Sequence, residues 1–478
     1  MQSGLLKSLA GSLFFLIVSL NAFSQNAYTI KFKITGLKDS VCYLYHHYGK
    51  GQYVSKDTAK ADADGNLLFQ GKTKLPEGVY ALVLPKTYFD LLITSEQNFS
   101  IETDTADIIN TMKVTGSAEN KLFSDFQKEM ARRHKEVDPY AKALKTAKSQ
   151  DSITMLRKKV EEVEKAVMDY RKNLVKNNPA SFTSKIVKAT FEPEIPEAPL
   201  LPNGKTDSTF AFRYYKAHYF DNMDLSDERL LRTPFFHNKI ERYIKNLTVQ
   251  IPDSINKAAD ELLSKVTNKE LYRYCVWFIT NTYESSEIMG MDAVFVHMAE
   301  NYYLAGKIQG ADTSMLNKMK GRVAILKPIL LGKKAPNLYL TDTTNKVAEL
   351  HKIKSKYLVL FFYDPDCGHC RKTTPELLEF YKKNKSKGVQ IYAASIARKD
   401  EPWRKFIKEF KVQDWINVWD SLTVTDFNKV YDVYSTPVIY VLDENKKIIA
   451  KRLGVDQLEG FIDNYSKDLL EKISNKTN

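Results

Sequence analysis

Two cysteines separated by two residues are the part of this chain best suited to redox chemistry. Cys367 and Cys370 follow an apolar run, 357–362, that has the length of a strand buried on both faces. A helix is predicted directly after them, over 371–385. The free N–H groups and the positive dipole end of a helix stabilise a thiolate. The pair therefore predicts a thiol–disulfide exchange site at a strand–helix junction.

The spacing predicts a different role for each sulfur. Cys367 is expected to attack as the thiolate, and Cys370 can reach back along the first helical turn and resolve a mixed disulfide. Gly368 permits close approach of a substrate chain. His369, when cationic, favours the thiolate, whereas Asp366 opposes it. The reactive group is then the Cys367–Cys370 disulfide itself, and we expect no cofactor and no metal.

The elements that must position these sulfurs belong to an alternating pattern of strands and helices after Pro336. We expect strands at 389–395, 437–442 and 447–452, and helices at 403–410 and 456–473. Such a pattern predicts an α/β domain over 332–478. Thr436-Pro437 stands where one of these strands begins, which is among the few positions where a sheet tolerates proline.

Two regions of different composition precede this domain. Residues 25–116 contain short apolar or alternating runs separated by Gly, Asp and Pro turns, which predicts an all-β sandwich. Residues 117–331 show helical periodicity, clearest in an apolar stripe at spacings of three and four over 156–174. We therefore predict a multidomain chain, with a sandwich, a helical domain and an α/β domain in that order.

The first 24 residues predict a cleaved signal peptide. Lys7 precedes an apolar run at 13–20, and small residues flank Phe23 at the positions that a signal peptidase reads. No cysteine lies near this point, so we do not expect a lipid anchor. The mature chain is expected to be exported to the periplasm or cell envelope, without stable insertion in the membrane.

The charge and the other cysteines point to no further chemistry. The net charge is +13, from 71 Lys and Arg against 58 Asp and Glu, but the basic runs lie on predicted helix faces that also carry acids. We therefore expect no nucleic-acid partner. Cys42 and Cys275 fall in different predicted domains, and we expect both to be buried and unpaired.

The C-terminal domain resembles the TlpA/ResA branch of exported thioredoxin-like proteins. The resemblance is carried by Ala335-Pro336, by Cys367-Gly-His-Cys370 and by Thr436-Pro437. The two upstream regions are similar to uncharacterised domains that precede such thioredoxin domains in envelope proteins of Bacteroidota, through 114–120, 215–222 and 289–297. The resemblance implies a thiol–disulfide oxidoreductase that acts on protein clients. It also implies a reductant that a membrane electron donor keeps supplied.

The resemblance adds a role for the second motif and marks two departures. Beside a Cys-x-x-Cys site we favour a cis Pro437, in a loop where the backbone at Thr436 pairs with an extended substrate. Thioredoxins usually place a buried acid where this chain has Phe361, and a Trp where it has Asp366. Proton transfer must then use water or another group. The Gly-His pair resembles the more oxidising disulfide isomerases, so direction stays open.

Other protein classes fit the sequence less well. A peroxiredoxin needs a Pro-x-x-x-Thr/Ser-x-x-Cys pattern, but Leu360 and Asp364 stand at its first and fifth positions. A copper-delivery protein needs a downstream histidine, and none follows His369. A structural zinc site needs two further ligands beside Cys367 and Cys370, and the sequence has no second pair of this kind. The alternative that remains is an envelope binding or scaffold protein with a vestigial thioredoxin domain.

Overall fold

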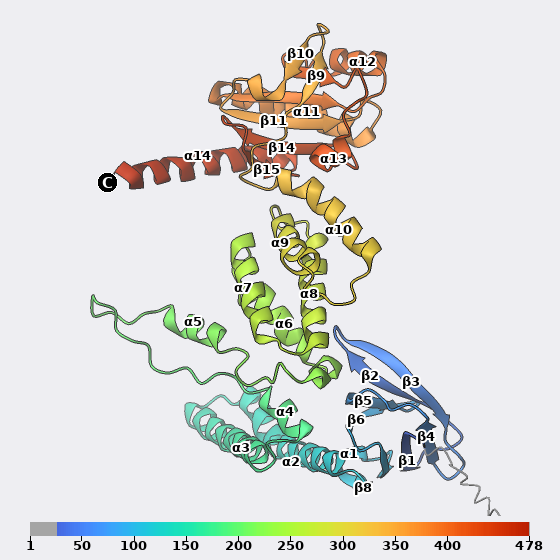
Figure 1. Cartoon of the computed structure of the whole chain (residues 1–478). Coiled ribbons are helices and arrows are strands. Elements are labelled where there is room, and N and C mark those ends of the chain that lie inside the picture. Colours follow the sequence, from blue (N-terminus) through green and yellow to red (C-terminus); the bar gives the residue numbers. More distant parts are fainter. Residues whose placement is uncertain (1–25, 478) are drawn as a thin grey trace, which may run out of the picture. The chain divides into compact units, whose positions relative to one another are not determined.

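The structure is a computed structural model that describes residues 26–477, so the predicted signal peptide lies outside the described residues (Figure 1). The described chain forms two compact units. The first unit contains the described residues up to Glu194, with Phe220–Asp224 and Arg229–Phe236; the second contains Ile195–Tyr219, Leu225–Glu228 and the chain from His237 onward. Among residues 26–477, none of the helices combines the length and hydropathy that a membrane span requires.

Two four-stranded sheets enclose the main hydrophobic core of the first unit. Their strand orders are β4-β1-β7-β8 and β3-β2-β5-β6. The strands are β1 (Tyr28–Thr35), β2 (Val41–Tyr48), β3 (Gln52–Lys60), β4 (Asn66–Gly71), β5 (Gly78–Val83), β6 (Tyr88–Ile93), β7 (Asn98–Asp104) and β8 (Lys113–Thr115). In β1, Ile30 and Phe32 are buried while Lys31 and Lys33 are exposed. This alternation directs one face of each sheet into a shared core and confirms the predicted β-sandwich.

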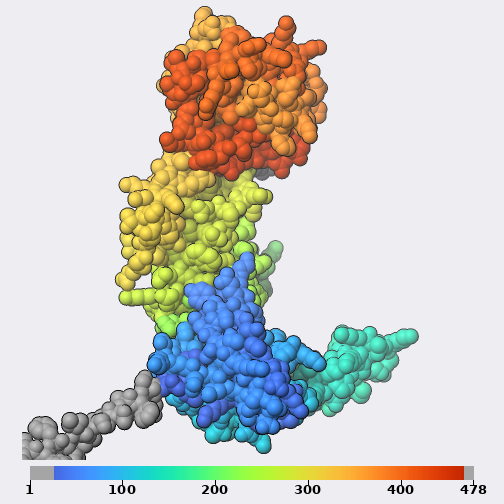
Figure 2. Space-filling view, turned by 90° about the vertical axis from the view of Figure 1, so that its right-hand side faces the viewer, coloured from blue at the N-terminus to red at the C-terminus, as the bar shows by residue number. Residues whose placement is uncertain are grey.

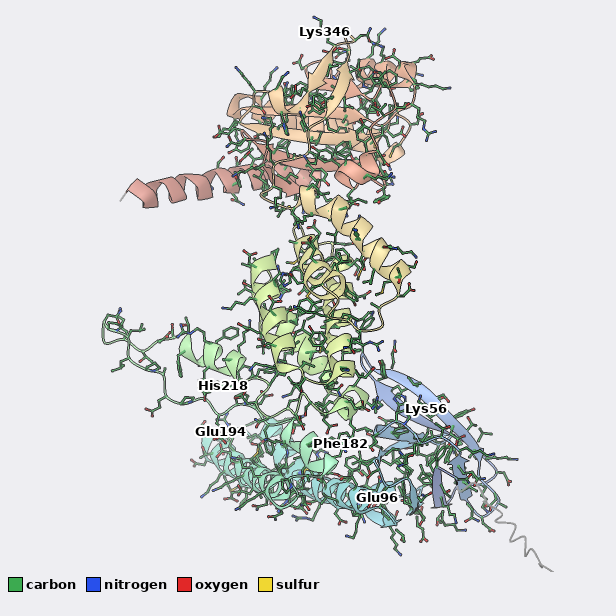
Figure 3. The ribbon with its side chains drawn as sticks, viewed as in Figure 1. Lys56, Glu96, Phe182, Glu194, His218 and Lys346 are labelled. Carbon is green, nitrogen blue, oxygen red and sulfur yellow. The ribbon has the colours of Figure 1, made fainter. Side chains whose placement is uncertain are left out.

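Helices of the first unit pack beside these sheets. They are α1 (Ile108–Thr111), α2 (Ala118–Thr146), α3 (Gln150–Asn177) and α4 (Phe182–Lys188). Asn120 of α2 accepts the N–H of Leu92 in β6 at 2.8 Å and donates to the Leu92 carbonyl at 2.7 Å. Glu96, labelled in Figure 3, accepts the N–H of Ala118 at 2.9 Å. The start of α2 is therefore fixed to the sheet, and the tip of the α2–α3 hairpin stands out from the strands (Figure 2).

The second unit begins with a helical region. Its helices are α5 (Phe210–Ala217), α6 (Phe236–Lys245), α7 (Pro252–Lys265), α8 (Lys269–Glu284), α9 (Asp292–Met298) and α10 (Thr313–Leu326), with a π-helical segment η2 (Ala299–Leu304) and short 3₁₀ turns between them. Asn268 caps α8, because its side chain accepts the N–H groups of Glu270 and Leu271. This region confirms the predicted central helical class.

A seven-stranded mixed sheet forms the rest of the second unit. Its strands follow the order β10-β9-β13-β12-β11-β14-β15. Their bounds are β9 (Tyr339–Asp342), β10 (Val347–Glu349), β11 (Tyr357–Tyr363), β12 (Val389–Ser395), β13 (Ile416–Trp419), β14 (Val438–Asp443) and β15 (Ile448–Lys451). The interior strand β11 is buried throughout, and it pairs in parallel with β12 and antiparallel with β14. The sheet and its helices confirm the predicted α/β thioredoxin-like class.

Successive residues of β11 supply the two cores of this sheet. Val359 and Phe361 face the core formed with α11 (Gly368–Asn384), α12 (Asp400–Phe410) and α14 (Val455–Thr477). Leu360 and Phe362 face the other core, which contains residues of α13 (Phe427–Tyr431) and of α9 and α10. Helices that precede the α/β domain in sequence therefore complete one face of its sheet.

A buried ion pair reinforces this contact between the helical region and the sheet. Lys451 at the end of β15 is buried and pairs with Asp292 of α9. Its ammonium group also donates to the carbonyl of Ile329 at 3.0 Å. Because both partners come from the helical region, β15 is held to that region by polar contacts as well as by the apolar core.

Candidate active site

The two predicted redox cysteines lie at the start of α11, directly after the loop that leaves β11. The helix begins at Gly368, three residues earlier than its apolar pattern predicts, and Cys367 is its N-cap. The difference arises because the cap and first turn carry Cys-Gly-His-Cys, which supplies no helical stripe. The sulfur of Cys367 accepts the N–H of Cys370 at 3.5 Å. This places a sulfur where serine or aspartate oxygens commonly cap helices.

The surroundings of the two sulfurs differ in exposure and charge preference. Cys367 is half-buried, whereas Cys370 is fully buried. Burial acts to raise the pKa of Cys367, but hydrogen bonds to its sulfur outweigh burial and hold this pKa below that of an ordinary thiol. The donors are the backbone of Cys370 and His369 and the side chains of Cys370 and Thr436. Burial raises the pKa of Cys370 to about 12. Of the two sulfurs, Cys367 is therefore the one that ionises more readily, and Cys370 stays a thiol at neutral pH.

Thr436 and Pro437 lie against the first sulfur because β14 is the antiparallel neighbour of β11. The register pairs Phe362 near the end of β11 with Val438 at the start of β14. The thiol of Cys367 donates to the carbonyl oxygen of Thr436 at 3.4 Å. The bond between Thr436 and Pro437 is cis, as expected from the sequence. The two motifs singled out in the sequence thus meet at one end of the sheet.

The two residues between the cysteines face solvent. Gly368 and His369 are both exposed. A Cβ atom built on Gly368 would meet no atom within 4 Å, so the space above this residue is open. An extended chain can approach the Cys367 sulfur from this side. The backbone N–H of His369 helps to lower the pKa of Cys367.

Phe361 and Asp366, the two positions where this chain departs from thioredoxins, lie in different surroundings. Phe361 is fully buried, and its ring stacks on Tyr363 with centroids 5.1 Å apart. Its site is therefore part of the apolar core beneath Cys370, and its side chain carries no proton. Asp366 is exposed, and its N–H donates to the side chain of Asp364 at 2.9 Å.

Three charged side chains near Thr436 were not singled out from the sequence. The carboxylate of Asp432 is almost fully buried and pairs with the guanidinium groups of Arg322 and Arg452. Arg322 lies 110 residues before Asp432, so no local pattern reveals the pair. The three residues border a hollow of about 690 Å³ that Tyr434 and Pro437 also line. This hollow opens beside the loop that contacts Cys367.

The other two cysteines belong to elements that contribute nothing to this site. Cys42 is in β2 of the first unit and Cys275 is in α8 of the second, and both are buried free thiols. Burial raises the pKa of both, that of Cys275 to about 12. Over residues 26–477, His, Cys, Asp and Glu side chains form no group of three or more that could hold a metal ion. Among the four cysteines, Cys367 is thus the only one that is not fully buried.

Comparison with known families divides the chain into three parts. Residues 330–469 match the Redoxin family. Residues 171–324 match a domain of unknown function, DUF5106, and residues 28–123 match a second, DUF4369.

Several known proteins share the C-terminal part. The thiol-disulfide oxidoreductase ResA of a Bacillus cereus strain is 29% identical over 146 residues, which cover 30% of this chain and 83% of that protein. ResA of Bacillus subtilis (strain 168) is 30% identical over 134 residues, which cover 28% of this chain and 73% of that protein. A solved domain of a possible thiol-disulfide isomerase from Cytophaga hutchinsonii is 54% identical, covers 30% of this chain and 98% of its own, and has a TM-score of 0.29. The chain therefore belongs to the TlpA/ResA-like thioredoxin family of thiol-disulfide oxidoreductases, and it carries additional domains before the thioredoxin-like one.

Proposed function

We propose that this chain is an exported oxidoreductase that exchanges dithiols and disulfides with protein clients through Cys367-Gly-His-Cys370, acting as a reductant. The observation that carries the proposal is the asymmetry of the two sulfurs. Cys367 is accessible and has a lowered pKa, whereas Cys370 is buried and has a pKa raised to about 12. One sulfur is therefore ready to attack, and the other stays protonated until an intermediate brings it into use.

The first chemical step is attack on a client disulfide. The Cys367 thiolate forms a bond to one client sulfur, the client S–S bond breaks, and the second client sulfur leaves as a thiolate. The N–H groups at the start of α11 hold the attacking charge before this step. The open space above Gly368 leaves room for the client backbone beside the sulfur.

The second step releases the client. Cys370 loses its proton and attacks the Cys367 sulfur, so that the Cys367–Cys370 bond forms and the remaining client sulfur leaves as a thiolate. Because the acid of thioredoxins is replaced by Phe361, we assign the proton of Cys370 to the client thiolate freed in the first step or to water. The client disulfide has then gained two electrons, and the cysteine pair has lost two.

A reductant of this kind needs a source of electrons to return the pair to two thiols. We assign this role to a membrane electron donor, since an exported protein is separated from the cytosolic thiol pool. Export itself rests on residues 1–24, whose charge, apolar run and small residues fit a cleaved signal. Fusing this segment to a reporter enzyme that is active only outside the cytoplasm tests export directly.

Trapping of clients tests the exchange reaction. A Cys370→Ser chain cannot resolve the first intermediate, so it should accumulate disulfide-linked complexes in the envelope that a reducing agent dissolves. A chain with Cys367→Ser as well is the matched control and should trap nothing. Complexes that persist without Cys367, or no complexes at all, would instead favour a binding or scaffold protein with a vestigial site.

The direction of exchange needs a separate measurement. Equilibrating the purified chain with mixtures of reduced and oxidised glutathione gives the reduction potential of the pair. A reductant should have a potential nearer the thioredoxin value of about −270 mV than the isomerase value of about −180 mV. A value at or above the isomerase one would reverse the proposed direction while leaving the exchange site intact.

A further inference from the structure

A buried carboxylate held by two arginines lies close to the redox site. Asp432 follows α13, and its side chain is only 2% exposed. Arg322 contacts both of its oxygens, with Nη1 on Oδ1 and Nη2 on Oδ2, the latter at 3.1 Å. Arg452 donates from Nη2 to Oδ2. Paired, bidentate contacts of this kind fix both the position and the orientation of a carboxylate.

The arginine that makes the bidentate contact comes from the helical region. Arg322 lies on α10, and the adjacent Val323 and Leu326 belong to the same core as Leu360 and Phe362 of β11. The backbone that carries Arg322 is therefore fixed against the sheet by apolar packing. Because this backbone is fixed, the guanidinium group of Arg322 holds the carboxylate of Asp432 in a fixed place.

Asp432 begins the short segment that ends at the redox site. We call residues 432–437 the Thr436 loop. At its far end β14 starts, with Val438 paired to Phe362. Near that end the carbonyl of Thr436 accepts the thiol of Cys367 at 3.4 Å. The loop is thus held by strand pairing on one side and by the ion pairs of Asp432 on the other.

The side chain of Thr436 contributes to the reactivity of the attacking sulfur. A hydrogen bond from this side chain helps to lower the pKa of Cys367, whereas the contact with the Thr436 carbonyl is made only by the protonated sulfur. A loop free to shift at Asp432 would hold this donor less well. The reactivity of Cys367 is therefore connected to Arg322 through two polar contacts and four residues of backbone.

We propose that Arg322 is a positioning residue for thiol–disulfide exchange, which acts through Asp432 to hold the Thr436 loop against Cys367. The region before the thioredoxin-like domain is then part of the redox machinery. This inference rests on the proposed function of Cys367 as the attacking thiolate. Arg452 supports the same carboxylate, but it comes from the thioredoxin-like domain itself.

The test compares variants of the full chain in a Cys370→Ser background, so that Cys367 is the reactive thiol. The rate of Cys367 alkylation by iodoacetamide is followed from pH 5 to pH 10, because this small reagent needs no client-binding surface. Arg322→Gln should move the midpoint of the pH profile upward and slow alkylation at neutral pH by about fivefold, the effect of one weakened hydrogen bond. Arg322→Lys keeps the positive charge but cannot make the paired contact with both carboxylate oxygens. Its alkylation midpoint and rate should lie between those of the parent chain and those of Arg322→Gln.

Lys320→Gln is the matched control, since Lys320 is exposed on the same helix two residues away. It should leave the profile unchanged. Near-UV circular dichroism shows whether each variant is folded. If Arg322→Gln is not folded, the alkylation profile of Arg322→Lys tests the positioning role of Arg322. A folded variant with the wild-type profile would overturn the positioning role.

Failure of the proposed function gives a different result. In that case the parent Cys367 would itself alkylate like an unperturbed cysteine, and the chain without substitutions would not reduce a peptide disulfide. If the parent chain reacts as proposed and only the Arg322 variants show no effect, the exchange function stands and this inference alone is wrong.

Discussion

The thiol of Cys367 donates to the carbonyl oxygen of Thr436 at 3.4 Å, although 69 residues separate them in the sequence. The antiparallel pairing of β11 with β14 produces this contact, because it brings the end of one strand beside the start of the other. The attacking sulfur therefore contacts two segments, the start of α11 and the Thr436 loop. Substitutions in either segment should change the rate at which Cys367 reacts.

Removing the hydroxyl of Thr436 should make Cys367 less acidic. Thr436→Val keeps the branched shape but removes a hydrogen bond that lowers the pKa of Cys367. A net loss of about 1 kcal/mol corresponds to roughly fivefold less thiolate at neutral pH. Iodoacetamide alkylation measures this fraction. Thr436→Ser keeps the hydroxyl and should behave like the unchanged chain; equal slowing in both variants would assign the effect to packing.

The two cysteines should respond to pH in opposite ways. Cys367 has a lowered pKa, so in a Cys370→Ser chain its alkylation should reach half its maximal rate at a pH below that of an unperturbed cysteine. Cys370 has a pKa raised to about 12 by burial, so in a Cys367→Ser chain it should stay unreactive below about pH 10. Mass spectrometry of the alkylated peptides separates the two. Similar profiles for both cysteines would contradict the assigned roles.

Phe361 should matter for stability and not for proton transfer. Its ring is fully buried and meets Trp415 edge-on with centroids 6.3 Å apart. Phe361→Ala should cost about 3–5 kcal/mol of folding free energy, since it leaves a cavity in a packed core. Tryptophan fluorescence during urea unfolding reports the loss. Below the unfolding transition, the pH profile of Cys367 alkylation should stay unchanged; a shifted profile would give Phe361 a part in the chemistry.

Acid should weaken the first unit through His46. Burial is the main cause that lowers the pKa of His46, to about 4. An unfolded histidine takes up its proton near pH 6.5, so stability is fully present above that pH and falls as pH drops from 6.5 toward 4. The loss reaches at most about 3 kcal/mol. Hydrogen exchange of β2 should show it.

Two substitutions check the assignment to His46. His46→Phe keeps a ring against Tyr80, whose centroid lies 5.4 Å from that of His46, and should remove most of the acid sensitivity of β2. His134→Gln changes an exposed histidine of α2 and should leave the acid sensitivity of β2 unchanged. Acid sensitivity that persists in His46→Phe would assign the effect to another group.

Local patterns were sufficient where one element carried its own signal. The period-two alternation of β1 and the continuous apolar run of β11 both predicted strands within a residue or two. The spacing of Cys367 and Cys370 placed the candidate site at a strand–helix junction, which the structure shows. Short strands such as β10 and β13 were missed, because three or four residues do not establish a period.

Contacts between distant segments could not be predicted in this way. Nothing near Arg322 in the sequence indicates that its partner is Asp432, and nothing in α9 indicates the pairing of Asp292 with Lys451. These contacts depend on α9 and α10 covering one face of the sheet. The sequence pattern separated the helical region from the thioredoxin-like domain, whereas the shared core joins them.

The most direct test of the account is the fate of a single disulfide. The reduced chain is mixed with one equivalent of a peptide that contains an intramolecular disulfide, and the products are quenched with acid and mapped by mass spectrometry. We predict a Cys367–Cys370 disulfide formed in step with peptide reduction, and in Cys370→Ser a mixed disulfide on Cys367. Cys42 and Cys275 should stay reduced, since both are buried. A peptide that remains oxidised while the chain is folded, or a mixed disulfide on any cysteine other than Cys367, would contradict the account.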